Sequence, residues 1–301
     1  MYTGLLLILG ALFAGYCIRI HSRSLQLVLR RFSSAMLYLI LFLMGFGLAL
    51  VEDLGSNLLA MLQQTLFLVG ALLIANLGCL YLIGRYLAMP SPHSETAGQS
   101  KGASLAEPLR LIATVGVGLL LGLLHGQALP AQSAIAEWAL VALVFAIGID
   151  LRAAGISLRQ LLLNRRGLLI ALTVVVSSMP VGLAAAWYFE LPWAAGLAMT
   201  SGYGWYSLSG ALIGDGLNPV LGSTAFMVDM GRELLTLLLI PVLMGRSPAA
   251  IIGYAGATAM DFSLPMLQRA GGNQIVPVAI ASGFILSLLC PVLVLFWLGL
   301  V

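Results

Sequence analysis

The sequence predicts an all-α polytopic membrane protein, built as a single integral membrane domain over residues 1–301, with about eight full transmembrane helices and two interrupted or re-entrant segments. Hydrophobic residues make up 61% of the chain and charged residues only 8%, and the mean hydropathy is +1.06. Soluble proteins average about 45–50% apolar and about 25% charged residues. Apolar runs recur along nearly the whole chain, and one helical span takes roughly 20 residues. A water-soluble globule is excluded, because too few polar side chains exist to cover its surface.

The first six spans follow from apolar runs that polar or charged stretches separate. They are expected at residues 3–20, 35–51, 58–87, 109–128, 133–151 and 167–189. The first run has no basic segment before it and its arginines follow it, so we expect a retained span rather than a cleaved signal peptide. The polar stretch at about 89–107 is expected as a cytoplasmic loop.

Arginines gather in alternate loops. Residues 19–31 carry four arginines, whereas 52–56 carry Glu52 and Asp53. Residues 152–166 again carry four arginines, whereas 126–133 carry no lysine or arginine. The positive-inside rule places the arginine-bearing loops in the cytoplasm and the N-terminus outside. The formal net charge of +3 therefore comes from loops rather than from one basic face, which argues against nucleic acid as a partner.

A short internal repeat indicates that repeated units build the scaffold. The segments 42–48 and 145–151 align as FLMGFGL and FAIGIDL, each near the end of a corresponding span. Chance similarity between helices rich in leucine and glycine stays open as an alternative. Internal repeats are common in transporters, where the binding site forms between the repeats.

Two later segments interrupt the apolar pattern with residues that break helices. Residues 197–210 combine glycines, aromatic residues and hydroxyls, and residues 253–265 place Asp261 just before a proline. Glycine weakens a helix, and non-helical backbone at membrane depth survives only where it is buried in protein or lines a cavity. Two interrupted segments predict a transporter binding site. Ordinary kinked helices that pack through small residues are the alternative.

Two arginines suggest how the last third is arranged. If Arg246 lies in the cytoplasm, the region from Glu190 to Gly245 contains one full crossing and one re-entrant hairpin. Residues 249–270 are then expected to enter from the cytoplasmic side and return, which keeps Arg269 inside. The last run, 273–300, leads outward.

Ionisable side chains inside the membrane indicate a functional or structural role, because inserting each one costs about 2.5 to 3.5 kcal/mol on insertion scales. On a helix, Asp229 and Glu233 share one face and Arg232 lies close to Asp229. With Asp261, this region keeps an excess of acids, as expected where a cation or a proton is held. An Asp229–Arg232 ion pair and a solvated turn at Asp215 are the structural alternatives.

Several stretches closely resemble the lysine exporter LysO family of bacterial inner-membrane proteins. They are GYGWYSLSG at 202–210, GRELL at 231–235, GATAMDFSLP at 256–265 and LNRRG at 163–167. The resemblance implies export of L-lysine and its toxic analogues from the cytoplasm, driven by proton antiport, with important acids at Glu233 and Asp261. It implies no enzymatic activity.

The expected site combines these acids with the interrupted segments. L-Lysine carries two ammonium groups and one carboxylate, so buried acids would bind the amines and the N-termini of broken helices would bind the carboxylate. The candidate substrate- or proton-binding residues are Glu233, Asp261, Asp229, Arg232, Gly202, Tyr203, Gly204, Trp205, Tyr206, Ser207, Ser209 and Ser263. Asn57 and Asn76 are further candidates for lining the pathway.

Other functions fit the residues less well. A sodium- or proton-coupled carrier of another small organic ion shares every compositional feature and stays open. An intramembrane aspartyl protease would need a G-x-G-D motif, which neither Asp150 nor Asp215 completes. The three cysteines, Cys17, Cys79 and Cys290, lie apart in apolar runs and indicate neither a disulfide nor a metal site. No cofactor is expected, the partners are L-lysine, protons and the lipid bilayer, and an oligomer stays open.

Overall fold

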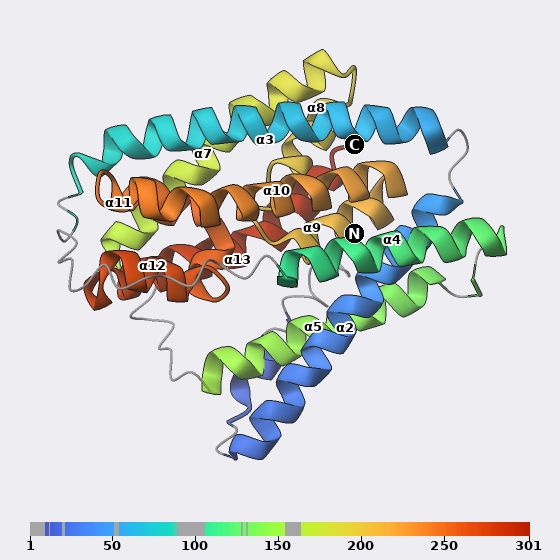
Figure 1. Cartoon of the computed structure of the whole chain (residues 1–301), viewed down its shortest axis with the longest axis horizontal. Helices are drawn as coiled ribbons and strands as arrows, with labels where there is room; N and C mark the ends of the chain where they lie inside the picture. Colours follow the sequence, from blue (N-terminus) through green and yellow to red (C-terminus); the bar gives the residue numbers. More distant parts are fainter. Residues whose placement is uncertain are drawn as a thin grey trace.

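A computed structural model describes most of the chain as helices (Figure 1). The described residues are 10–11, 13–19, 22–50, 54–87, 89, 106–127, 129–130, 132–153 and 164–301. Within these ranges the protein has helices and no β-strand, which confirms the all-α class. The expectations for Glu52 and Asp53 and for nearly all of the loop at 89–107 lie outside the described residues.

The long helices alternate with short ones in the second half of the chain. The elements are α2 (Arg23–Ala49), α3 (Leu54–Gly84), α4 (Ala106–His125), α5 (Gln132–Ala153), α7 (Arg165–Tyr188), α8 (Trp193–Met199), α9 (Tyr206–Gly216), α10 (Pro219–Leu243), α11 (Pro248–Ala255), the 3-10 turn η1 (Gly256–Met260), α12 (Leu264–Gly271), the short turn η2 (Asn273–Ile275) and α13 (Val276–Leu298). Four described stretches are long and apolar enough to cross a bilayer: Ser24–Ala49, Asn57–Gly84, Arg165–Tyr188 and Val276–Leu298. The full number of spans stays a prediction.

The second helix begins earlier than its hydropathy predicts. It starts at Arg23 rather than at residue 35, so Arg30 and Arg31 lie in a helix and not in a loop. Leucine and valine side chains between the arginines give this first part a pattern in which one face is apolar. A count of apolar residues misses such an extension, because the charges lower the average.

The helices α2, α4 and α5 lie side by side (Figure 1), and glycines allow their backbones to come into contact. A Cβ added to Gly118 of α4 would overlap the carbonyl oxygen of Phe42 in α2, and one added to Gly15 would overlap the carbonyl oxygen of Phe145 in α5. Both the two glycines and the two phenylalanines are 103 positions apart in the sequence. The same backbone contact is thus made twice, with the partners exchanged, which supports the expected internal repeat.

The segment α8–α9 forms a hairpin that enters and leaves at one end of the helical bundle. Trp193, at the start of α8, packs against Trp297 near the end of α13, with ring centroids 6.2 Å apart. Gly216, at the end of α9, lies against Leu298, also at the end of α13. Both arms of this first hairpin therefore meet the bundle where α13 ends.

The segment α11–η1–α12 forms a second hairpin at the opposite end. Ser247, just before α11, lies against Gly84 at the end of α3, and Gly271 at the end of α12 lies against Met244, just after α10. The sequence α10–α11–α12 repeats the order of α7–α8–α9, a long helix followed by two short ones around a break. Because the hairpins enter from opposite ends, the arrangement is that of an inverted repeat.

Candidate functional site

The tips of the two hairpins meet inside the protein. The backbone N–H of Ala257 donates a hydrogen bond to the carbonyl oxygen of Tyr203, with 2.8 Å between the nitrogen and the oxygen. Gly256 has φ +67° and no room for a Cβ beside that carbonyl, while Tyr203 itself has φ +51°. A left-handed tyrosine is unfavourable by about 1–2 kcal/mol. Both breaks expected from the sequence are therefore present, and each one fixes the other.

Asp229 of α10 binds the tip of the first hairpin. Its carboxylate accepts hydrogen bonds from the backbone N–H of Gly204 at 2.8 Å and from the hydroxyl of Ser209 at 2.6 Å. A Cβ on Gly202 would overlap this carboxylate. The acceptor lies at the N-terminus of α9, where the partial positive charge of the helix favours a negative group. Asp229 thus holds the first tip in place.

Arg232, one helical turn further along α10, binds the second hairpin instead. Its Nε donates to the carbonyl oxygen of Tyr254 at 2.7 Å, and its Nη2 donates to the carbonyl oxygen of Gly253 at 3.1 Å. Both carbonyls lie in the last turn of α11, where the partial negative charge of the helix favours a cation.

The ion pair that the spacing of Asp229 and Arg232 suggests is not formed. Within residues 164–301 the structure gives neither side chain an ion-pair partner, because Asp229 turns to one hairpin tip and Arg232 to the other. One turn of α10 therefore fastens both hairpins, each through a charge of the sign that its helix end attracts.

The two acids expected to act together lie in different surroundings. Glu233 is buried, with a residue exposure of 2%. Asp261 follows η1 and is exposed, and its carboxylate accepts a hydrogen bond from the backbone N–H of Phe262. The expected burial of Asp261 is wrong. The chain turns at this residue between η1 and α12, and the turn directs the carboxylate outward instead of toward the hairpin crossing.

The other expected residues gather around the two breaks. Gly202, Tyr203 and Gly204 form the buried tip of the first hairpin, and Ser207 and Ser209 lie buried on the first turns of α9. Trp205 and Tyr206 are only half-buried. Tyr206 packs edge-on against Phe226 of α10.

Hydroxyl groups complete the second tip. The hydroxyls of Ser263 and Thr258 are 3.0 Å apart, and Thr258 also donates to the carbonyl oxygen of Ala255. Thr258 was not singled out from the sequence, although it lies in the interrupted stretch. The signal for it was a hydroxyl about one turn after the end of a helix, since such a group can satisfy a backbone carbonyl that the break frees.

Asn76 lies in a separate polar cluster between α3 and α7. Its side-chain oxygen accepts from the hydroxyls of Ser177 at 2.6 Å and Ser178 at 3.2 Å, and all three residues are buried. Asn76 therefore joins two helices. The expectation that it lines a pathway is left as a prediction.

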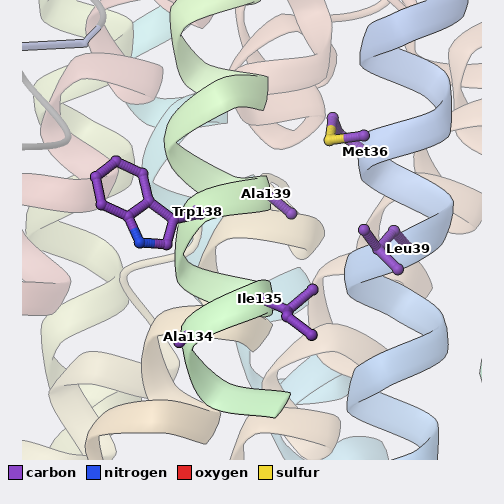
Figure 2. Close-up of a pocket in the computed structure, with 6 residues that line it drawn as sticks. All are labelled: Met36, Leu39, Ala134, Ile135, Trp138 and Ala139. Carbon is purple, nitrogen blue, oxygen red and sulfur yellow. The ribbon is translucent and has the colours of Figure 1, made fainter. Parts of the chain in front are cut away.

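An apolar groove lies between α2 and α5, and none of its lining residues belongs to the polar groups described above (Figure 2). Ile135 and Ala139 of α5 face Met36 and Leu39 of α2 there. The groove offers an amino acid no charged partner, so we do not assign it to the site.

Comparison with known proteins identifies relatives of this chain. A protein of Escherichia coli named lysine exporter LysO is 43% identical over 297 residues, which cover 99% of both chains. A Haemophilus influenzae protein named putative lysine exporter is 39% identical over 187 residues, which cover 62% of this chain and 96% of that protein. No solved structure matches the chain. The family described as lysine exporter LysO matches residues 112–298. The chain, a multi-pass membrane protein, belongs to the lysine exporter LysO family.

Proposed function

We propose that this protein exports L-lysine and its toxic analogues from the cytoplasm in exchange for protons. The observation that carries the proposal is the burial of Glu233 beside the helical turn that fastens both hairpin tips. Membership of the lysine exporter family and the name of the full-length relative support lysine as the substrate.

Glu233 is the proposed group that protons and the substrate share. The carboxylate of Asp229 and two nitrogens of Arg232 hold the hairpins, and Glu233 is a second buried acid on the same turn of α10. A buried carboxylate is costly unless a proton or a cation neutralises it. An ammonium group of lysine or a proton serves equally, and each displaces the other. Protonation from outside then releases lysine outward, which couples the two fluxes.

Asp261 has a different proposed role, because it is exposed. It lies at the turn between η1 and α12, at the edge of the second hairpin. A carboxylate there attracts a dibasic substrate toward the buried site before Glu233 binds it. In this proposal the protein lies in the bacterial inner membrane with its N-terminus on the periplasmic side.

Transport by purified protein in proteoliposomes tests the proposal. Under an imposed pH difference, the unchanged protein is expected to move radiolabelled L-lysine against its gradient. Glu233→Gln is expected to abolish this pH-driven movement while thermal unfolding stays near that of the unchanged protein. Asp215→Asn, at an exposed position near the end of α9, is the matched control and should transport normally.

Two results would contradict the proposal in different ways. Undiminished pH-driven lysine transport by Glu233→Gln would remove this residue from the coupling. Transport of another small organic ion, with no movement of lysine by the unchanged protein, would overturn the substrate and leave the hairpin architecture standing.

A further inference from the structure

Two buried side chains that contact each other, Arg232 and Tyr254, each carry a hydrogen-bond donor without a partner among the described residues. The Nη1 nitrogen of Arg232 and the hydroxyl of Tyr254 each have no hydrogen-bond partner among the described residues. Arg232 is 1% exposed and Tyr254 is 0% exposed. The guanidinium carbon of Arg232 lies 5.2 Å from the centre of the Tyr254 ring, so the two groups are in contact.

Packing alone gives no reason to keep these donors. Buried polar groups in proteins are nearly always hydrogen-bonded, and a buried charge normally has an opposite charge beside it. The carbonyls at the end of α11 satisfy Nε and Nη2 of Arg232, but within residues 164–301 no carboxylate forms an ion pair with it. The Arg232–Tyr254 pair therefore presents a positive charge and two donors, which is the chemistry that an anion completes.

We propose that Nη1 of Arg232 and the hydroxyl of Tyr254 bind the carboxylate of the transported amino acid. The inference rests on the proposed function, which supplies a substrate with one carboxylate. A guanidinium group forms strong, directional hydrogen bonds with a carboxylate. Glu233, the next residue on α10, binds an amino group of the same substrate.

This assignment replaces the expectation that a broken-helix N-terminus binds the carboxylate. The N-terminus of α9 already faces the carboxylate of Asp229, which occupies the backbone N–H of Gly204. A second carboxylate there would meet like charge. The site consequently selects amino acids over amines of similar length that have no carboxylate.

A structural role for Tyr254 and a binding role predict different effects of Tyr254→Phe on lysine transport. The substitution keeps the ring on the guanidinium group and removes only a hydroxyl that has no partner in the described structure. If the residue serves packing alone, stability stays equal or rises and transport is unchanged. If the hydroxyl binds the substrate carboxylate, the KM for lysine rises about tenfold, as expected for one hydrogen bond to a charged group.

The experiment measures lysine transport by the full-length protein in proteoliposomes, with two competitors. L-Lysinamide keeps both amines and replaces the carboxylate by a neutral amide, and cadaverine has no carboxylate. Neither analogue is expected to compete effectively with L-lysine for transport by the unchanged protein. In Tyr254→Phe, the difference in apparent affinity between L-lysine and the two analogues is expected to be smaller. Ser282→Ala, which also removes a fully buried hydroxyl without a partner in the described residues, is the control and should leave KM unchanged.

The outcomes separate the inference from the proposed function. Equal competition by lysinamide and lysine in the unchanged protein overturns carboxylate binding, while lysine transport stands. A Tyr254→Phe variant with unaltered KM and unaltered selectivity also overturns it. Failure of the unchanged protein to move lysine at all overturns the proposed function and this inference together. Poor competition by lysinamide, with a raised KM in Tyr254→Phe and normal thermal stability, supports the inference.

Discussion

Asp229→Ala should loosen the first hairpin because it removes the acceptor for two buried donors. The backbone N–H of Gly204 would lose its partner at 2.8 Å, and the Ser209 hydroxyl would lose its partner at 2.6 Å. A buried donor left unsatisfied costs about 1–3 kcal/mol. The Ser209 hydroxyl can turn to the carbonyl oxygen of Tyr206 at 3.4 Å, so its loss lies at the low end. We therefore expect a destabilisation of about 2–4 kcal/mol.

Asp229→Asn should cost much less. The amide oxygen still accepts from the Gly204 N–H, and the amide nitrogen can donate to the Ser209 oxygen once that hydroxyl turns to Tyr206. Only the interaction between the negative charge and the N-terminus of α9 is lost, which is worth about 0.3–1 kcal/mol. The variant is expected to keep the hairpin in place and to retain most of its lysine transport.

Hydrogen exchange at the amides of residues 202–209 measures the opening of this tip directly. A loss of 2–4 kcal/mol speeds exchange by about 30-fold to 700-fold in Asp229→Ala, because every 1.4 kcal/mol is a factor of ten. Asp229→Asn should exchange less than about tenfold faster, and Asp215→Ala, exposed near the end of the same hairpin, should not change. If both Asp229 variants keep normal exchange but lose transport, the residue carries a proton or the substrate and does not serve to hold the tip.

Two glycine substitutions test the close contacts elsewhere. Gly256→Ala should destabilise the hairpin crossing by about 2 kcal/mol or more and abolish transport, because its φ of +67° is strained for alanine and its Cβ would overlap a carbonyl of the first hairpin. Gly272→Ala, with φ +76° and open space, should cost only the strain, and thermal unfolding in detergent compares the two. Gly118→Ala should push α4 away from α2 and cost about 1–3 kcal/mol, whereas Gly116→Ala on the same helix meets nothing within 4 Å and should be neutral. Equal unfolding temperatures within either pair would contradict the corresponding contact.

Local chemistry made the hairpins predictable. The breaks at 200–205 and at 256–263 coincide with clusters of glycine, hydroxyl and aromatic residues in the sequence. A glycine at a break acts on its own backbone, whatever the rest of the fold does, so reading along the chain can find it. The repeat could also be found in the sequence, because the segments 42–48 and 145–151 align at an offset of 103 positions. The two glycine contacts between helices show the same offset.

The partners of the buried charges could not be predicted in the same way. The spacing of Asp229 and Arg232 correctly places them one helical turn apart, but spacing says nothing about segments that fold against that turn. Arg232 donates to a carbonyl near the end of α11, and Asp229 accepts from a backbone N–H just before α9. Neither segment is adjacent to these residues in sequence. Asp261 was expected inside for its position before a proline, yet the turn at that residue faces outward.

The sequence by itself determined that the protein lies in a membrane, that it is helical and where its helices stop. Hydropathy and backbone freedom are properties of each short stretch of chain. Only the tertiary structure decided which hairpin each charge holds, which acid is buried and which donors are left for a ligand. A buried charge is stabilised by whatever dipole or hydrogen-bonding group lies within a few ångströms of it. Those neighbours come together only when two hairpins from opposite ends of the bundle meet beside α10.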